Sequence, residues 1–277
     1  MYVANSGDKS VAVIDGSTDT MIAMRSTAAR PYALAIDEVT DKVFVSNTFS
    51  DQLTVIDGKT NAISNVKAGS ADAILVDARR SKVYLLGYES DSVRVLDEQT
   101  DTLTKLFAGA MHLWAIAQLG SVLYVTHVQD ASLEAINVET HATKTIATGA
   151  MPCALAEDDD RNELYVANYA GSISIIDTRN GSAIATLNVG GHPQAIAVDT
   201  EQRLLYVADA QESSVNIIDI QSRRVLQILK MNGQPYALSV DTRTHRVFAA
   251  TTGSSPYKEL KVQLAPALLG KNRGHKD

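Results

Sequence analysis

Several features that would mark a familiar class of protein are missing from this sequence of 277 residues. Cys153 is the only cysteine, which excludes an internal disulfide framework but leaves the redox compartment open. No apolar run approaches the roughly 18–20 residues that a bilayer-spanning helix needs, so we predict no transmembrane segment. The net charge of −7 argues against a nucleic-acid surface built on bulk positive charge. Single-stranded nucleic acid stays open as a partner, because aromatic side chains can stack on its bases.

Catalytic motifs are missing too. The sequence contains no GxSxG nucleophile elbow, no HExxH zinc motif, no CxxCH haem motif and no GxGxxG or Walker loop. The sequence assigns no base to Cys153, so an inert, partly buried thiol explains this residue as well as a nucleophile does. We therefore predict no catalytic residue, no metal and no cofactor.

What the sequence does contain is a repeat of about 40 residues. The phrase YVANSGDKSVAVID at 2–15 returns as FVSNTFSDQLTVID, YLLGYESDSVRVLD, YVTHVQDASLEAIN, YVANYAGSISIID and YVADAQESSVNIID. Its copies, 40 to 42 residues apart, begin at Tyr2, Phe44, Tyr84, Tyr124, Tyr165, Tyr206 and, in degenerate form, Phe248. A fixed period of this length is the signature of a repeat architecture, so we predict one domain.

Each repeat divides into four short runs separated by turn residues. PYALAID (31–37) and PQAIAVD (193–199) represent the first run, YVAN the second, SVAVID the third and AIATLNV (183–189) the more polar fourth. Such runs predict β-strands, and a run that is apolar on both faces predicts a strand buried on both faces. Asp15, Asp57 and Asp97 follow the third run, where an aspartate accepts backbone amides and closes a tight hairpin. Four antiparallel strands per repeat, arranged radially, predict an all-β fold, a β-propeller of four-stranded blades.

The phrases YVAN…SVAVID…RPYALAID and YVAN…SISIID…GGHPQAIAVD resemble the YVTN-type β-propeller repeat over about residues 1–251. The sequence departs from that pattern where the second strand loses its final Asn, at Leu86-Gly87, Thr126-His127, Ala208-Asp209 and Ala250-Thr251. It also departs where the inner strand loses its proline, at Ala71 and Leu113. The resemblance implies a protein of the periplasm or cell surface, as in surface-layer proteins. No signal peptide is visible in the sequence, and a cytoplasmic location is the alternative.

The strands counted from the repeats do not complete every blade of the ring. The first repeat lacks its inner strand, and the last, ending near KVQLA at 261–265, lacks its outer one. We predict seven blades in a single domain over residues 1–265, followed by a basic tail over 266–277. We also expect sequence upstream of Met1 to supply missing strands. In a six-bladed alternative, PYALSVD at 235–241 completes the blade that begins at Tyr2.

Sites on propellers gather at the mouth of the central channel, which is formed by the loops entering the inner strands and the loops between second and third strands. Two columns of the repeat alignment vary there while the scaffold positions hardly change. One column reads Tyr32, Asp72, Trp114, Cys153, Gln194 and Tyr236, and the other reads Arg30, Ser70, His112, Met151, His192 and Gln234. We predict a ligand-binding ring whose aromatic faces and polar groups are Arg30, Tyr32, Asp72, His112, Trp114, His192, Gln194, Gln234 and Tyr236. The alternative interpretation is that these are exposed loop residues that tolerate substitution and bind nothing.

Two further groups of residues are weaker candidates for a metal-binding site. His112, His127 and His192 could hold a metal together, but no short ligand spacing supports this, and solvated or hydrogen-bonded histidines are the better interpretation. The acidic run EDDD at 157–160 lacks the alternating ligands and the glycine of a calcium loop. We predict that it is a solvated loop on the face opposite the mouth.

These observations predict a non-catalytic scaffold that binds a protein, a peptide or an extended polymer at the channel mouth. The alternative is an enzyme with its site in the central channel, either a hydrolase resembling propeller lactonases or an oxidoreductase-associated protein. A lactonase would need several converging acidic ligands, and only Asp72 and Asp209 qualify. A quinoprotein would need tryptophans in most blades, and Trp114 is the only one. A structural surface-layer component is a third possibility, against which the aromatic mouth argues mildly.

Overall fold

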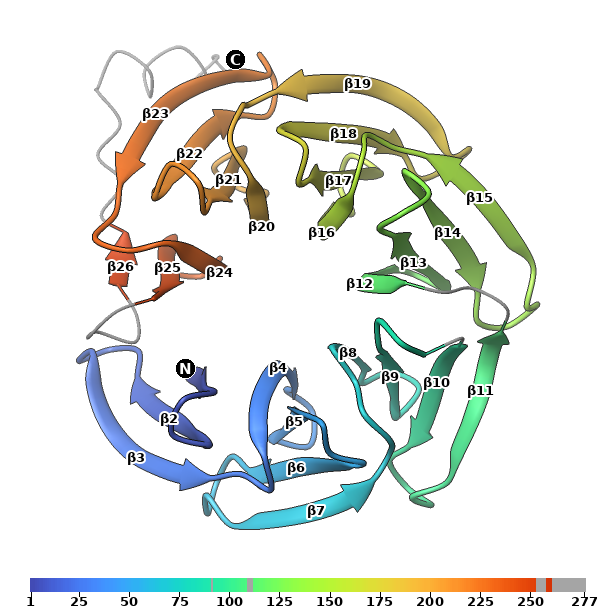
Figure 1. The fold of residues 1–277 in the computed structure, drawn as a ribbon, viewed down its shortest axis with the longest axis vertical. Helices are drawn as coiled ribbons and strands as arrows, with labels where there is room; N and C mark the ends of the chain where they lie inside the picture. Colours follow the sequence, from blue (N-terminus) through green and yellow to red (C-terminus); the bar gives the residue numbers. More distant parts are fainter. Residues whose placement is uncertain (91, 109–111, 253–257, 261–277) are drawn as a thin grey trace, which may run out of the picture.

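The structure is a computed structural model that describes residues 1–90, 92–108, 112–252 and 258–260. It folds them into seven antiparallel sheets arranged as a ring (Figure 1). Five sheets have four strands, and the first and last have three. The described residues include no helix with the length and apolar character needed to cross a membrane. The all-β propeller of four-stranded blades that the sequence predicts is confirmed.

The strands follow one another in chain order within each sheet. The first sheet contains β1 (Tyr2–Asn5), β2 (Ser10–Asp15) and β3 (Thr20–Ser26), and the last contains β24 (Pro235–Asp241), β25 (Arg246–Thr251) and β26 (Lys258–Leu260). The complete sheets have as inner strands β4 (Arg30–Asp37), β8 (Ala73–Asp77), β12 (Leu113–Leu119), β16 (Pro152–Asp158) and β20 (Pro193–Asp199). Their second strands are β5 (Lys42–Thr48), β9 (Lys82–Leu86), β13 (Val122–His127), β17 (Glu163–Asn168) and β21 (Leu204–Asp209). Their third strands are β6 (Gln52–Asp57), β10 (Ser92–Asp97), β14 (Ser132–Asn137), β18 (Ser172–Asp177) and β22 (Ser214–Asp219). Their outer strands are β7 (Ile63–Lys67), β11 (Leu103–Ala108), β15 (Thr143–Ala147), β19 (Ser182–Asn188) and β23 (Arg224–Lys230).

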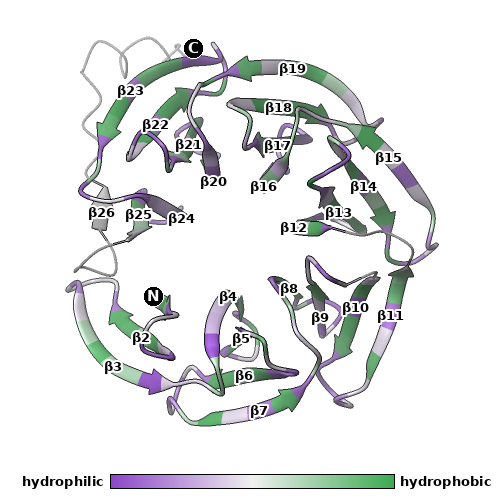
Figure 2. Cartoon of the chain, viewed as in Figure 1, coloured by the Kyte–Doolittle hydropathy of each residue, from purple (hydrophilic) through white to green (hydrophobic). Residues whose placement is uncertain are grey.

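The second and third strands are buried on both faces, as their sequences predict. Every residue of β21 is buried, and so is every residue of β22 except the last. The outer strand β19 has no buried residue. Figure 2 shows the same contrast, with apolar residues along β14 and β18 and hydrophilic segments interrupting β3 and β15. This distribution follows from the ring, because the second and third strands pack between neighbouring sheets, whereas the outer strands lie on its rim against solvent.

Buried apolar side chains join each sheet to the next from the first sheet to the seventh. Between the fifth and sixth sheets, for example, Ile173 and Val207 belong to one cluster. The last and first sheets share no buried apolar cluster within the described residues, since Val3, Ala12 and Ile14 of the first sheet pack among themselves. The hydrophobic packing of the ring is therefore continuous except at this one junction.

Arg246 of β25 joins the two ends of the ring. Its Nη2 donates to both carboxylate oxygens of Asp19, at 2.6 and 2.7 Å, and its Nη1 donates to the carbonyl oxygen of Gly16. The guanidinium carbon also lies 4.9 Å from the ring centroid of Phe248. The ion pair with Asp19 and the hydrogen bond to Gly16 thus connect sheets that have no common apolar core, while the cation–π contact with Phe248 lies within β25.

The backbone pairing keeps the first and last sheets separate. Strand β24 pairs with β25, and β1 pairs with β2. Among the residues that the structure describes, the first sheet has no inner strand, as the sequence predicts. The third strand of the last sheet is β26, just before the KVQLA segment at 261–265. That segment and the predicted tail over 266–277 lie outside the described residues.

The aspartate turns predicted from the sequence are present. Asp57 Oδ1 accepts the backbone amides of Lys59 and Thr60 at 3.0 and 2.7 Å. These bonds, with the Thr60 amide contributing most, lower the pKa of the Asp57 carboxyl. Asp97 forms the same turn, and an ion pair with Lys82 helps to lower its pKa to about 2. Each turn therefore closes a hairpin on the face opposite the channel mouth.

Candidate binding surface at the channel mouth

One face of the ring carries the loops that enter the inner strands together with the loops between second and third strands, as predicted. We call this face the mouth surface. Backbone hydrogen bonds tie the two kinds of loop together within a sheet. The amide of Tyr169, which follows β17, donates to the carbonyl of Met151 at 2.8 Å, and the amide of Ala210 donates to the carbonyl of His192 at 3.1 Å. Side chains from both kinds of loop therefore meet on one surface.

Three rings from the third and fourth sheets form a cluster on the mouth surface. The ring centroid of Tyr88 lies 4.7 Å from that of His112 and 5.9 Å from that of Trp114, which it meets edge-on. Gln129 Nε2 donates to the Tyr88 hydroxyl at 3.1 Å. His112 and Trp114 are among the predicted ligand-binding residues, and the structure brings them together. Tyr88 and Gln129 come from loops between second and third strands, and the sequence analysis did not select them.

Asp72, also a predicted ligand group, supports the loop of the neighbouring strand. Its Oδ2 accepts the backbone amide of Tyr88 at 2.8 Å. Its negative charge adds to the effect of burial in raising the pKa of the Tyr32 phenol. Asp72 thus holds Tyr88 in the three-ring cluster and supplies negative charge beside Tyr32.

A second pair of rings lies between the fifth and sixth sheets. Tyr169 and His192 stack with centroids 4.3 Å apart and planes inclined by 20°. Asp209, at the end of β21, orients this loop, because its Oδ1 accepts the backbone amides of His192 and Glu212, both at 3.0 Å. Asp209 is itself buried, so its carboxylate is used for structure. The predicted residue His192 therefore has a fixed aromatic partner that the sequence analysis missed.

Cys153 and Gln194 occupy equivalent positions in the fifth and sixth sheets. Cys153 Sγ lies 3.0 Å from the carbonyl oxygen of Pro193, and burial raises the pKa of this thiol to about 12. The thiol is therefore protonated at neutral pH and donates a hydrogen bond, which fits the inert thiol considered from the sequence. Gln194 Oε1 is buried and has no hydrogen-bond partner among the described residues. A buried acceptor without a hydrogen bond is rare, and a donor on a ligand could supply that bond.

Aromatic side chains on the second and seventh sheets are open to solvent. Tyr32 and Tyr236 are each 47% exposed, and Phe49, in the loop after β5, is 91% exposed. The Tyr236 hydroxyl donates to Gln234 Oε1 at 2.8 Å. Arg30, Tyr32, Gln234 and Tyr236 are all exposed on the mouth surface. The predicted residues thus form local groups spaced around the ring, not one closed pocket.

The sequence contains a signal for the aromatic residues that the analysis did not select, namely Tyr88, Tyr169 and Phe49. Tyr88 and Tyr169 are the first residues after the motif position that ends the second strand, and Phe49 stands two residues after Asn47. The alignment of these loops would have shown aromatic residues there in three of the repeats. This pattern is easily missed, because each of these loops contains only a few residues to align.

A cavity of about 260 Å³ lies against the inner strands of the fifth, sixth and seventh sheets. Residues 155–157 of β16, 196–198 of β20 and 238–240 of β24 line it, and these strands border the centre of the ring (Figure 1). None of the predicted ligand-binding residues is among them. Apart from Glu157 and Ser239, the lining side chains are aliphatic.

The prediction of a solvated acidic loop at 157–160 is wrong for its first two residues, Glu157 and Asp158. Both belong to β16, which continues further than the charge run indicated. Burial raises the pKa of the Glu157 carboxyl to about 7. Asp158 is fully buried and pairs with Arg161 at 2.8 Å. Asp159 and Asp160 are exposed, so the prediction is right for the second half of the run only.

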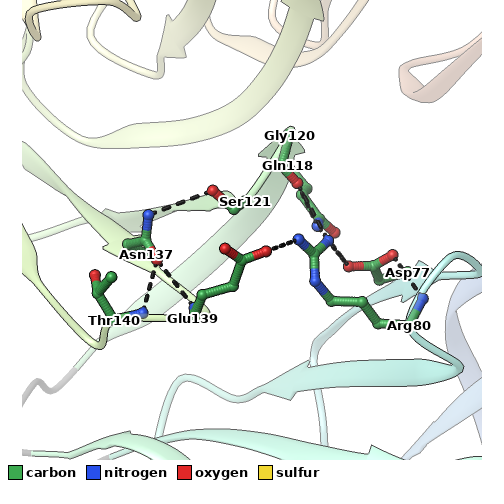
Figure 3. Close-up of polar contacts among 8 residues, drawn as sticks. All are labelled: Asp77, Arg80, Gln118, Gly120, Ser121, Asn137, Glu139 and Thr140. Atoms are coloured by element: carbon green, nitrogen blue, oxygen red, sulfur yellow. Dashed lines mark hydrogen bonds and ion pairs between the residues drawn. The ribbon is translucent and has the colours of Figure 1, made fainter.

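The face opposite the mouth has a polar network between the third and fourth sheets (Figure 3). Arg80 donates to Asp77 at 2.8 Å and to Glu139 at 2.5 Å, and these bonds raise its pKa. Gln118 donates to the same Asp77 at 2.7 Å. A cavity of about 380 Å³ beside the network is also lined by Arg80, but the carboxylates already neutralise this cation. The network therefore holds two sheets together.

The histidines considered as metal ligands are not gathered at one point. His112 contacts Tyr88 with the two ring planes inclined by 54°, and His192 stacks on Tyr169. His127 is half-buried, and burial lowers its pKa. Over the ranges that the structure describes, no group of three or more His, Cys, Asp or Glu side chains is arranged to hold a metal ion.

Comparisons with known proteins agree on the fold. No protein-family model matches the sequence, and no curated protein matches it significantly. Among solved structures, the chain is similar to hydrazine synthase from Kuenenia stuttgartiensis, with a TM-score of 0.80 and 16% identity over 95% of this chain and 92% of that one. It is also similar to U3-55K, with a TM-score of 0.78 and 10% identity over 90% and 84% of the two chains. The WD40 repeats of RRP9 give a TM-score of 0.80 and 10% identity over 92% and 84%. At sequence identities this low, the similarity shows only a common fold, which is a WD40-like β-propeller.

Proposed function

We propose that this protein is a non-catalytic scaffold of the YVTN-repeat type that binds a protein, a peptide or an extended polymer across the mouth surface. The observation that carries this proposal is the set of ring groups spaced around the mouth. Tyr88 with His112 and Trp114 forms one group, and Tyr169 with His192 forms another. Fixed aromatic side chains contribute large contact area at low entropic cost and dominate many binding surfaces.

The spacing of these groups favours an extended ligand. A small molecule would need polar and apolar groups converging in one pocket, whereas here they lie in separate groups on several sheets. The exposed rings of Tyr32, Phe49 and Tyr236 lie on the second and seventh sheets. The unsatisfied acceptor of Gln194 suits a backbone amide of a peptide.

Selection from a random peptide library on immobilised protein tests this proposal. Peptides enriched by the wild-type protein are expected to bind Trp114→Ala and Tyr236→Ala at least ~10-fold more weakly, as loss of a contact worth more than about 1.4 kcal/mol implies. The control is Val39→Ala, which removes another exposed side chain, in the loop between β4 and β5 on the opposite face. Equal loss in the control variant, or no loss in the mouth variants, would contradict the proposal.

We further propose an extracytoplasmic location, which rests on the resemblance to YVTN-repeat proteins of the periplasm and cell surface. Cell fractionation with an antibody against the propeller is the direct test. Signal in the periplasmic or surface fraction, with protease sensitivity in intact or outer-membrane-permeabilised cells, is the expected result. Recovery with a cytoplasmic marker enzyme would contradict it.

A second candidate function is an enzyme with its site in the central channel, and Glu157 is the observation that favours it. A carboxyl with a pKa of about 7 has the proton affinity of a general acid or base at neutral pH. The test is hydrolysis of a panel of lactones and esters by the wild-type protein and by Glu157→Gln. A turnover lost in this variant and kept in Asp160→Asn would support the enzyme and weaken the scaffold proposal.

A further inference from the structure

The three-ring cluster of the third and fourth sheets offers aromatic surface to a ligand. Tyr88, His112 and Trp114 are each half-buried, so none of them is sealed in the core. Tyr88 meets Trp114 edge-on, with the ring planes inclined by 84°, and a contact of this kind leaves ring faces uncovered. The face of an aromatic ring carries partial negative charge and attracts a cation. The cluster is therefore a surface on which a cationic group can stack.

Two carboxylates lie in the loops that hold this cluster. Glu89 directly follows Tyr88, and Asp130 directly follows Gln129, whose side-chain amide donates to the Tyr88 hydroxyl at 3.1 Å. Both acidic residues are exposed. Neither side chain forms an ion pair or a hydrogen bond with another residue in the part of the chain that the structure describes. Their negative charge is therefore available to a ligand beside the rings.

Acidic residues of the same kind of loop in two other sheets already have cationic partners. Asp51, in the loop after β5, pairs with Lys67 at 3.6 Å, and Glu212, in the loop after β21, pairs with Lys230 at 3.2 Å. In both cases the lysine belongs to the outer strand of the same sheet. The third and fourth sheets differ from these two because their loop carboxylates keep their charge, and they keep it next to aromatic rings.

Asp72 contributes less to this charge, because a cation of the protein lies near it. Its Oδ2 accepts the Tyr88 amide at 2.8 Å. Burial lowers the pKa of Arg94, and the charge of Asp72 opposes that shift. The Arg94 guanidinium donates to the backbone carbonyls of Ala68 and Ser70, so it is tied to the loop. Asp72 and Arg94 thus offset each other, and the exposed carboxylates of the two loops supply the charge that a ligand meets.

We propose that this part of the mouth surface binds an arginine side chain of a partner peptide or protein, with the guanidinium stacked on the Tyr88–Trp114 pair. The N–H groups of the guanidinium then pair with the carboxylates of Glu89 and Asp130. Arginine suits the site better than lysine, because its planar guanidinium stacks on aromatic faces and presents paired donors to a carboxylate. This inference rests on the function proposed for the mouth surface and names the chemistry of its ligand.

The fluorescence of Trp114 tests the proposal without a label, because this residue is the only tryptophan in the sequence. The probe is the peptide Gly-Arg-Gly-Arg-Gly-Arg-Gly. Its control has citrulline in place of each arginine, which keeps the length and planar shape of the side chain and removes the charge. We expect a saturable change with the arginine peptide and at least ~10-fold weaker binding of the citrulline peptide. Binding is also expected to weaken as salt is raised, because exposed charges are screened.

A pair of double variants locates the site. Glu89→Gln with Asp130→Asn is expected to bind the arginine peptide at least ~5-fold more weakly than the wild type. The matched control, Asp159→Asn with Asp160→Asn, removes two exposed carboxylates from the opposite face and is expected to leave affinity unchanged. Circular dichroism confirms that both are folded, and the comparison of the two peptides on wild-type protein depends on neither. Equal affinity for the two peptides, or equal loss in the two double variants, would overturn the proposal. A fluorescence change that does not saturate up to ~1 mM of the arginine peptide would overturn it as well.

These results separate the arginine site from the function on which it rests. Peptides selected from the random library that bind through Trp114 and keep their affinity when citrulline replaces arginine would overturn the arginine site and leave the scaffold function intact. Selected peptides that bind the mouth variants as well as the wild type would overturn both.

Discussion

Arg246 and Asp19, at opposite ends of the chain, form a two-pronged ion pair that joins the last sheet of the ring to the first. Every other pair of successive sheets shares buried apolar side chains. The ring therefore depends on a polar contact at one junction and on hydrophobic packing at all others. Polar contacts at the surface respond to salt, whereas apolar packing at the other junctions responds much less.

Asp19→Asn tests how much this junction contributes. The two side chains are 23% and 38% exposed, so we expect a loss of less than about 1 kcal/mol in the free energy of unfolding. The loss is expected to shrink further at high salt, because screening already weakens the wild-type pair. Urea unfolding at low and high salt is the measurement. The comparison variant is Ile218→Ala, in the cluster between the fifth and sixth sheets, for which about 2–5 kcal/mol is expected at either salt concentration. Equal losses in the two variants would contradict this view of the junction.

Gly191→Ala is expected to disrupt the loop that carries His192. A β-carbon at this position would lie 1.7 Å from Asp209 Oδ2, and the residue has a φ of +57°. The carboxylate would have to leave the amide of His192, so we expect a loss of more than about 2 kcal/mol in stability. The neighbouring Gly190→Ala is the control, because it shares a positive φ of +72° but has no atom within 4 Å of the added carbon. About 1 kcal/mol is expected for that variant from backbone strain alone. Thermal unfolding of the pair separates the two effects.

Glu157 predicts a pH dependence of stability. Its carboxyl has a folded pKa of about 7, above the ordinary glutamate pKa of 4.5 that applies in the unfolded chain. Between these values the folded protein keeps a proton that the unfolded chain has released, so stability falls as pH rises through this window. The loss amounts to at most about 3 kcal/mol. Glu157→Gln is expected to remove this slope and to be more stable than the wild type at pH 8. Chemical unfolding from pH 4 to 8 measures it, with Asp160→Asn as an exposed control. A wild-type slope that persists in Glu157→Gln would contradict the assignment.

Cys153 is expected to resist thiol reagents. With a pKa of about 12 and a hydrogen bond to the Pro193 carbonyl, it has very little thiolate at pH 8. Reaction with Ellman's reagent is expected to be at least ~100-fold slower in the folded protein than in guanidinium chloride. Rapid, stoichiometric labelling of the folded protein would show that the mouth surface opens around this residue.

Features that rest on local, repeated residues could be predicted from the sequence. The strand order, the turns at Asp57 and Asp97 and the common face of the two kinds of loop all follow from patterns within about 40 residues. Pairings between sheets could not be predicted in this way. The stack of Tyr169 on His192 depends on how two adjacent sheets are spaced, and the pair of Arg246 with Asp19 depends on where the ring closes.

Glu157 shows a different limit of sequence interpretation. A run of four acidic residues predicts a solvated loop from composition alone, but strand β16 extends into the run, where Glu157 is half-buried and Asp158 is buried. The predicted ligand-binding residues of the mouth remain a prediction. The structure shows where they lie and which of them are in contact, and the variants described above test whether they bind.

The edge of β1 has no strand beside it among the described residues, and this has a thermodynamic consequence. Any segment that pairs with this edge only in the folded state stabilises the fold by RT ln(1 + [L]/Kd), which is about 2.7 kcal/mol at a hundredfold excess over Kd. The same segment would place apolar contacts at the one junction that now lacks them. Folding of the ring and occupancy of the edge would then be linked equilibria, and the melting temperature would rise with the concentration of that segment.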